Sequence, residues 1–295
     1  MNKTMKWKQK SMAYMPYYVL LLPFVSTYIL FMLYPLIQGF IVSFYDWEIL
    51  GEKAYVGLKN YIDLFHDPVF YSSLWHTILF VLLSVPLLVV VGLGLAMIIH
   101  QPLKGQIIFR LIFFIPTVLT VSVVASVWSA VLGSYGGMAN TIFRMFGASQ
   151  DILWLNNPTL AWISVIVVTL WWTVGFNMIL YLAGLQDIPD ELYEAARIDG
   201  ANGWQSFIHI TVPSLRRITL LVTFLQVVAS FKIFSQVYLV TTGGPAGSTR
   251  TIIQYIYEVG FKKYEFGPSS AMSYIFFFVL LVVSMIQFRI SKERS

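Results

Sequence analysis

The sequence predicts an all-α membrane protein with six transmembrane helices, both termini in the cytoplasm, and a short cytoplasmic helix between the fourth and fifth spans. Hydrophobic residues make up 58% of the 295 residues and charged residues only 11%, whereas about 25% of residues are charged in typical soluble domains. Six apolar windows approach or exceed the roughly 20 residues that a helix needs to cross the hydrocarbon core. The windows lack the alternation of barrel strands, and an open sheet would leave its edge amides unpaired in lipid.

The six windows are spread evenly along the chain, so they predict a single transmembrane domain over residues 17–290 with tails at 1–16 and 291–295. The first follows a basic run, KTMKWKQK, but it is too long for a signal peptide and lacks a small-residue cleavage site, so it is expected to remain as an uncleaved span. The windows run from Tyr17 to Ser43, Trp75 to Ile99, Leu111 to Leu132, Leu160 to Gly184, Leu215 to Leu239 and Ser269 to Phe288.

The orientation follows from the distribution of lysine and arginine, which are enriched in cytoplasmic loops. With the N-terminus inside, twelve of them lie on the cytoplasmic side and six on the outer side, while Lys232 falls within a span. The inner ones are Lys3, Lys6, Lys8, Lys10, Lys104, Arg110, Arg197, Arg216, Arg217, Arg289, Lys292 and Arg294, and the outer ones are Lys53, Lys59, Arg144, Arg250, Lys262 and Lys263.

Several kinds of site are not expected on this chain. It has no cysteine, which excludes thiolate chemistry and sulfur-bound metal clusters. Its basic residues form no face that would bind nucleic acid. The four histidines lack the HExxH spacing, no GxSxG occurs, and the segment GGPAGSTR lacks the lysine and the spacing of a phosphate-binding loop. The sequence therefore predicts no enzyme, no metal site and no cofactor bound by this chain.

A short helix with its own start and stop signals is predicted between Asp187 and Gly203. Pro189 suits the first helical position, acidic residues follow at the positive end of the helix dipole, and Gly200 supplies a left-handed stop. Leu192, Ala195 and Ala196 share one small apolar side. A helix of two to three turns is marginal in isolation, so either a partner or its own bundle must hold it.

The segment from Glu194 to Pro213 resembles the EAA motif of binding-protein-dependent ABC import permeases, whose pattern is E-A-A, three residues, G, nine residues, I-x-L-P. The spacing is intact, and the one departure is Val212 in place of leucine. Four further segments resemble the carbohydrate-uptake branch of that family, which includes the maltose and glycerol-phosphate permeases. These segments are SFYDW, YVGLKNYIDLF, FFIPTVLTVSVVASVW and TTGGPAGSTRTIIQYIY.

The resemblance implies a subunit in the bacterial cytoplasmic membrane that forms the translocation path for a sugar or oligosaccharide. The implied partners are a second homologous permease, two cytoplasmic ATPases that bind ATP and Mg, an extracytoplasmic solute-binding protein and membrane lipid. It also implies that the loop at 185–214 couples to an ATPase. The coupling residues would be Glu191, Tyr193, Glu194, Ala195, Ala196, Arg197, Asp199, Gly200, Ala201 and Pro213.

Polar and aromatic residues on one face of an apolar span are candidates for the substrate path. They occur in spans four and five, which flank the loop, although such residues also join membrane helices to one another. The sequence leaves two explanations for the charged Lys232 inside a span. Either its side chain reaches the outer interface of the membrane, or its ammonium group attracts an acidic sugar. The path candidates are Thr169, Trp172, Thr173, Phe176, Asn177, Gln226, Ser230 and Ile233.

Two alternatives to sugar import remain open from the sequence. One is an ABC permease for another solute, such as glycerol phosphate or an acidic oligosaccharide. The other is a stand-alone secondary carrier, which the absence of acidic residues inside the spans disfavours, because proton-coupled carriers use such residues.

Overall fold

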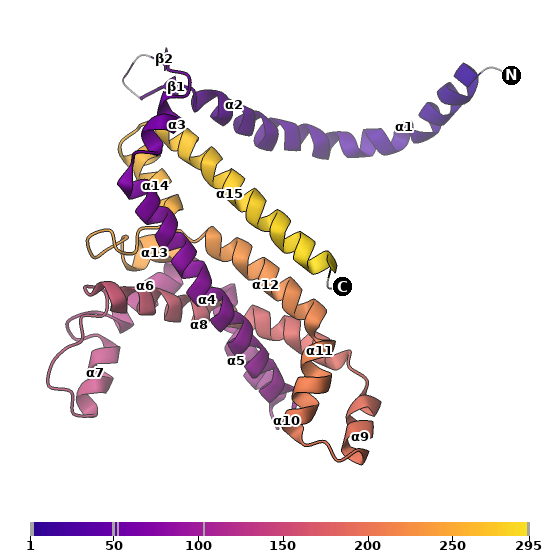
Figure 1. Ribbon diagram of the computed structural model, residues 1–295, viewed down its shortest axis with the longest axis vertical. Coiled ribbons are helices and arrows are strands. Elements are labelled where there is room, and N and C mark those ends of the chain that lie inside the picture. Colours follow the sequence, from indigo (N-terminus) through magenta and orange to yellow (C-terminus); the bar gives the residue numbers. More distant parts are fainter. Residues whose placement is uncertain (1–2, 49–50, 52, 103, 294–295) are drawn as a thin grey trace. The chain divides into compact units, whose positions relative to one another are not determined.

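The computed structural model describes residues 3–48, 51, 53–102 and 104–293, and helices dominate it (Figure 1). Four helical segments are long and apolar enough to cross a membrane, and the number rises to six if each of two bent helix pairs forms one span. Each predicted window overlaps one of these six segments, but the fifth window, Leu215 to Leu239, runs beyond its segment, which ends at Phe231. The four long segments are Tyr14–Val42, Pro68–His100, Pro158–Gln186 and Phe266–Ile290.

The chain divides into two compact units, residues 1–66 with 256–275 and residues 67–255 with 276–295. The first unit begins with an uninterrupted helical run that contains the first predicted span and starts inside the predicted tail. The backbone elements of this unit are α1 (Lys3–Tyr28), η1 (Ile29–Leu33), α2 (Tyr34–Val42), β1 (Tyr45–Asp46), β2 (Ala54–Tyr55), α3 (Lys59–Leu64), η3 (Glu258–Lys262) and the first part of α15 (Phe266–Glu293).

Asn60 organises the polar end of the first unit. Its buried amide Nδ2 donates to the carbonyls of Ser43 and Tyr45, each at 2.9 Å. The two short strands pair antiparallel, with Tyr45 opposite Tyr55. α15 begins close to this hairpin, since a Cβ on Gly267 would lie 1.9 Å from the Tyr45 carbonyl oxygen. These contacts fix the loop after the first span as a folded structure.

The second unit holds the remaining helices and the candidate site. Its core forms where α4 packs along α8, with α5 and α12 against the same pair. Its elements are α4 (Pro68–His100), α5 (Gln106–Val118), α6 (Val121–Val131), α7 (Met138–Met145), α8 (Pro158–Gln186), α9 (Asp190–Ile198), α10 (Gly203–Ser206), η2 (Phe207–Thr211), α11 (Val212–Ser214), α12 (Arg216–Phe231), α13 (Ser235–Val240), α14 (Ile252–Tyr257) and the end of α15.

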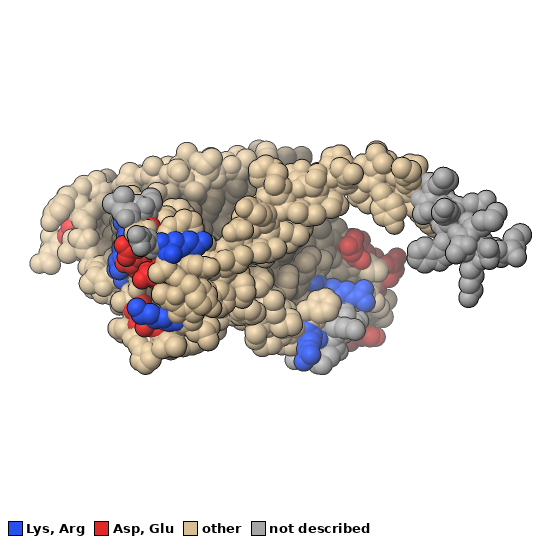
Figure 2. Space-filling model, turned by 90° about the horizontal axis from the view of Figure 1, so that it is seen from above, with Lys and Arg blue, Asp and Glu red and all other residues tan. Residues whose placement is uncertain are grey.

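Glycine permits the closest helix approach in this core. A Cβ on Gly175 of α8 would lie only 2.0 Å from the carbonyl oxygen of Phe113 in α5. A Cβ on Gly92 of α4 would likewise lie 2.8 Å from Cβ of Asn177. Small residues at such crossings let backbones approach, which is how helices associate in lipid. The view in Figure 2 shows mostly uncharged surface, and the charged residues gather in groups that contain both basic and acidic side chains.

The third predicted span, Leu111 to Leu132, is not a single straight helix. α5 and α6 are separate helices that meet at an angle of 103°. Leu119 and Thr120 are both extended, with ψ of 145° and 148°. Pro116 lies in the last turn of α5 and removes one backbone donor there, which favours a break shortly after it.

The fifth predicted span, Leu215 to Leu239, is also interrupted. α12 ends at Phe231, and α13 is a separate short helix. The 16 residues of α12 cover only about 24 Å, less than the roughly 30 Å of a bilayer core. α12 continues the segment Gly203–Ser214 across a bend of 65°. Lys232 is exposed at the C-cap of α12, so its ammonium group does not lie in the middle of a helix.

Candidate functional site

The predicted short helix is present as α9, which spans nine residues. Asp190 and Glu191 occupy its first turn, where negative charge is favoured by the helix dipole. Pro189 was expected at the first helical position, but it is the N-cap residue with an extended ψ of 133°. The proline still stops the preceding segment from continuing into α9, because it has no backbone N–H to donate.

The end of α9 is a Schellman motif. The Gly200 N–H donates to the Arg197 carbonyl at 3.1 Å, and the Ala201 N–H donates to the Ala196 carbonyl at 2.8 Å. Gly200 has a φ of +80°, so the predicted left-handed stop is confirmed. Asp199 is the C-cap residue. The motif satisfies two carbonyls that the end of the helix would otherwise leave without partners.

A capping box follows directly and starts the next helix. The Gln205 N–H donates to Asn202 Oδ1 at 2.9 Å, and the Asn202 N–H donates back to Gln205 Oε1 at 2.8 Å. The chain therefore passes from the end of α9 to the start of α10 with both helix ends satisfied. This gives the turn at residues 199–202 a defined backbone conformation.

One side of α9 packs on its own bundle. The Tyr193 hydroxyl lies 2.9 Å from Oγ1 of the buried Thr211, and the Tyr193 ring packs against the core formed by α8 and the start of α12. Thr211 lies in η2, which leads through α11 to α12. The sequence left open whether the bundle or a partner holds α9, and the structure shows that the bundle holds this side.

The opposite side of α9 is apolar and exposed. Leu192 is 47% exposed and Ile198 is 87% exposed, with the exposed Ala195 between them at a spacing of three residues. Ala196, which was expected on this side, is half-buried. We call Leu192, Ala195 and Ile198 the outward stripe. Ile198 was not among the predicted site residues, although its spacing from Ala195 is the signal that would have found it.

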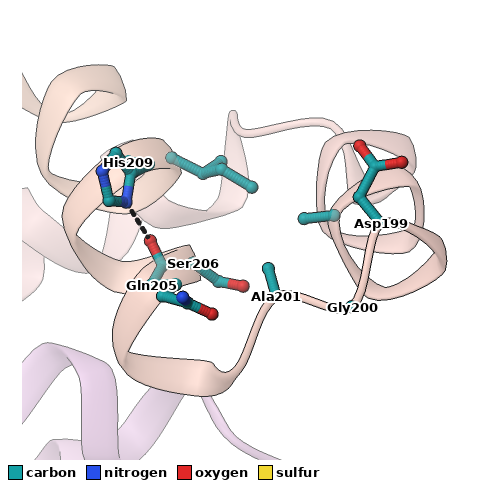
Figure 3. Close-up of a pocket in the computed structure, with 8 residues that line it drawn as sticks. Asp199, Gly200, Ala201, Gln205, Ser206 and His209 are labelled. Carbon is teal, nitrogen blue, oxygen red and sulfur yellow. Dashed lines mark hydrogen bonds between the residues drawn. The ribbon is translucent and has the colours of Figure 1, made fainter.

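A hollow of about 300 Å³ lies between the end of α9 and the segment α10–η2 (Figure 3). Asp199, Gly200 and Ala201 form one side, and Gln205 and His209 lie on the other. His209 Nδ1 is 2.9 Å from the Gln205 carbonyl oxygen, and since that oxygen only accepts, Nδ1 carries the hydrogen. Of the predicted coupling residues, Glu191, Glu194, Arg197 and Pro213 are exposed, while Ala201 is half-buried.

Asn177 and Gln226, two path candidates from different spans, meet in the structure. Gln226 Nε2 donates to Asn177 Oδ1 at 2.7 Å, and Asn177 Nδ2 lies 3.4 Å from the Leu88 carbonyl. Ser230 is 3.2 Å from Ser84, hydroxyl to hydroxyl. All these side chains are buried, so they form polar links among α4, α8 and α12.

The other path candidates make separate contacts. Thr169 and Thr173 each donate to the carbonyl four residues earlier in α8, at 2.8 and 2.7 Å. Trp172 donates its Nε1 hydrogen to the Leu119 carbonyl at 3.2 Å. Ile233 is buried near Phe80 and Trp162 rather than among the polar candidates.

Phe176 is the predicted path residue with the most exposed side chain, at 45%. No three His, Cys, Asp or Glu side chains gather as a possible metal site within residues 3–48, 51, 53–102 and 104–293.

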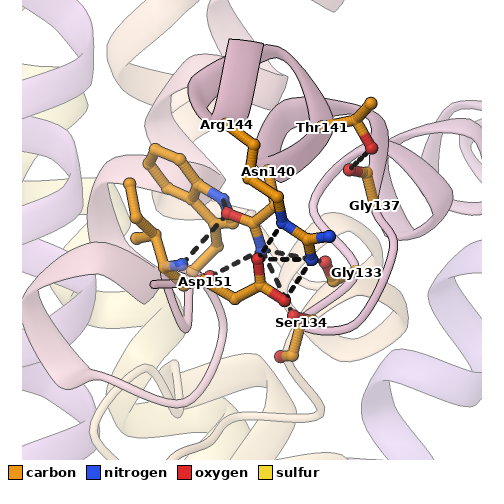
Figure 4. Close-up of polar contacts among 9 residues, drawn as sticks. Gly133, Ser134, Gly137, Asn140, Thr141, Arg144 and Asp151 are labelled. Carbon is orange, nitrogen blue, oxygen red and sulfur yellow. Dashed lines mark hydrogen bonds and ion pairs between the residues drawn. The ribbon is translucent and has the colours of Figure 1, made fainter. Parts of the chain in front are cut away.

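The loop between α6 and α8 is folded around the buried Asn140 (Figure 4). Asn140 Nδ2 lies 3.1 to 3.4 Å from three carbonyls, those of Gly133, Ser134 and Ile152. Its Oδ1 accepts from the Ile152 N–H and from Trp154 Nε1, both at 3.1 Å. Arg144 and Asp151 add an exposed two-pronged ion pair. The sequence did not single out Asn140, because its partners are set by the loop conformation.

Most of the chain matches a known protein family. A model of the binding-protein-dependent transport system inner membrane component matches residues 65–294. The arabinooligosaccharides transport system permease protein AraP of Bacillus subtilis is 35% identical over 277 residues, which cover 93% of this chain and 88% of AraP. The lactose transport system permease protein LacF of Rhizobium radiobacter is 32% identical over 277 residues, which cover 92% of this chain and 93% of LacF.

The fold has a close counterpart among solved structures. A bacterial alginate ABC transporter, in complex with an alginate pentasaccharide-bound periplasmic protein, contains a chain that superposes with a TM-score of 0.86. The match covers 97% of both chains at 22% identity, so it supports the fold alone. The family model matches residues 65–294, the relatives match over most of their length, and several helices are apolar enough to cross a membrane. This chain is therefore a multi-pass membrane protein of the binding-protein-dependent transport system inner membrane component family.

Proposed function

We propose that this chain is the permease subunit of an ATP-driven importer that carries a sugar or oligosaccharide across the bacterial cytoplasmic membrane. The observation that carries the proposal is α9, a capped helix with an exposed apolar stripe in a protein of this family. Relatives named as permeases for arabinooligosaccharides, lactose and trehalose/maltose support a carbohydrate as the substrate. Six spans with both termini in the cytoplasm belong to the same proposal.

The chain needs partners to perform this function. We propose a second permease subunit that completes the path, two cytoplasmic ATPases that supply ATP and Mg, and an extracytoplasmic binding protein that delivers the substrate. The family description names dependence on a binding protein. The segment GGPAGSTR lacks the lysine of a phosphate-binding loop, and in this proposal the ATPase subunits bind the ATP.

The geometry of α9 suggests how movement of an ATPase reaches the spans. In the proposal the outward stripe, with Glu194 and Arg197 beside it, rests on the ATPase. The opposite side is tied to Thr211 through Tyr193, and Thr211 leads into α12. A displacement of α9 is therefore transmitted to the helices that carry Asn177 and Gln226, as in transitions where packed elements shift as bodies.

The outward stripe provides a direct test of coupling. Ile198→Ser should weaken association with the ATPase and lower substrate-stimulated ATP hydrolysis, because it removes the most exposed apolar side chain of α9. The matched control is Phe146→Ser, since Phe146 is also 87% exposed but lies after α7 in another loop. Equal hydrolysis and equal ATPase recovery in both variants would count against the coupling role of α9.

We also propose that the faces carrying Thr173 and Gln226 contribute to the substrate path. The exposure of Phe176, one turn from Thr173, supports an aromatic contact for a sugar ring on this part of α8. Thr173→Ala should lower uptake without changing the recovery of the assembled complex. Unchanged transport kinetics in this variant would remove α8 from the proposed path.

An anionic solute is the second candidate substrate. A relative that is 30% identical is named as a permease for sulfoquinovosyl glycerol, whose sulfonate is charged. Binding of the cognate solute-binding protein to a panel of neutral, acidic and phosphorylated sugars distinguishes the two. An ion-gradient dependence of uptake that survives removal of the ATPases would instead indicate a secondary carrier.

A further inference from the structure

An apolar groove lies between α12 and the last turns of α15 within the second unit. It consists of two hollows of about 370 and 390 Å³ that share Phe224 of α12 and Phe288 of α15. Leu221 and Met285 extend the apolar wall along the two helices. We call this feature the α12–α15 groove. Neither the coupling loop nor the path candidates contribute to it.

Both charged residues that line the groove are arginines. Arg217 lies in the first turn of α12, and Arg289 lies near the end of α15. No acidic residue lines either hollow. The groove thus combines an apolar wall with two positive charges at one end of a membrane-spanning pair of helices, which is the arrangement that suits an anionic amphiphile.

We propose that the α12–α15 groove binds an anionic phospholipid. The phosphate lies between Arg217 and Arg289, and an acyl chain runs along Phe224 and Phe288. A multi-pass protein of this kind is surrounded by such lipids. The predicted topology places both arginines at the cytoplasmic boundary, where anionic lipids attract basic residues. A soluble anion would use the arginines but leave the apolar wall uncovered.

The first experiment measures retained lipid. The assembled transporter, purified in detergent, is given equal amounts of phosphatidylglycerol and phosphatidylcholine and examined by native mass spectrometry. Wild type should retain phosphatidylglycerol preferentially. Arg217→Gln with Arg289→Gln should lower that preference by about fivefold for each arginine, with phosphatidylcholine binding unchanged. Arg216→Gln is the control, because Arg216 precedes Arg217 in the same turn and does not line the groove.

Retention of phosphatidylglycerol by the double variant at the wild-type level, or an equal loss in Arg216→Gln, would overturn the proposal. A second measurement does not depend on the arginine variants folding well. The chain has no cysteine, so Phe288→Cys introduces a single thiol into it. A water-soluble maleimide should label this thiol several-fold more slowly in phosphatidylglycerol than in phosphatidylcholine. Equal protection in both lipids would mean that another subunit covers the groove, and the lipid proposal would then be wrong.

Discussion

Replacing Gly200 by alanine tests the stop of α9 in isolation. Gly200 has a φ of +80°, and a Cβ built on it would meet no atom within 4 Å. The substitution therefore removes no contact and adds no clash. Its only effect on the folded loop is the strain of a side chain in the left-handed region, about 1 to 2 kcal/mol.

This strain is large for a helix of nine residues. Such a helix is marginal without tertiary support, and 1 to 2 kcal/mol changes an equilibrium constant by about 5- to 30-fold. We expect Gly200→Ala to lower the population of the capped loop by up to this factor. If the ATPase docks only on the capped loop, substrate-stimulated ATP hydrolysis should fall accordingly. Gly200→Asn should fall less, because asparagine tolerates this conformation.

Gly203 supplies the matched control three residues away. A Cβ on Gly203 also meets no atom within 4 Å, but its φ is not positive, and it is the first residue of α10. Gly203→Ala should leave hydrolysis unchanged. The assay is substrate-stimulated hydrolysis by the reconstituted complex at several ATPase concentrations. If Gly200→Ala and Gly203→Ala both matched wild type within twofold, the link between the capped turn and coupling would be refuted.

Three further outcomes are expected. Gly175→Ala should prevent stable folding, because the added Cβ would lie 2.0 Å from a backbone oxygen of α5. Gly94 has open space around it, so the Gly94→Ala variant should have a melting temperature in detergent at or above that of the wild type. Gln226→Ala should destabilise the bundle by about 1 to 3 kcal/mol, because Asn177 Oδ1 loses its buried donor; an unchanged melting temperature would indicate that this pair is not formed. Asn140→Ala should expose residues 133–157 to limited proteolysis by removing the hydrogen bonds that close the loop, while Arg144→Gln should have little effect, since exposed ion pairs contribute at most about 1 kcal/mol.

Each apolar window overlaps a helical segment that could span a membrane. Helices are expected there because they satisfy their own backbone hydrogen bonds, which lipid cannot do. The windows did not reveal the breaks within the third and fifth windows. A window average measures apolar content, which is the same on both sides of Pro116 or Lys232. Pro116 favours a break because it removes a backbone donor, but whether the helix breaks there depends also on its contacts with neighbouring helices.

The candidate site likewise has features that the sequence predicted and features that it did not. The start and stop of α9 were predictable because Asp190, Glu191 and Gly200 act through backbone conformation and the helix dipole within a few residues. Ile198 was missed because the prediction grouped Ala196, and not Ile198, with Leu192 and Ala195. Only the packing of Tyr193 onto the core shows which side of α9 faces outward. The path candidates were chosen by spacing within each helix, which carries no information on whether two helices meet.

The sequence by itself determined that this is a helical membrane protein with a short, capped loop helix and an intact EAA spacing, because each of these depends on composition or on residues close together in the chain. Only the tertiary structure decided that Asn177 pairs with Gln226, that Asn140 closes the loop between α6 and α8, and that α12 and α15 form an apolar groove with two arginines. These features join residues far apart in sequence, and their partners are fixed by the packing of whole helices.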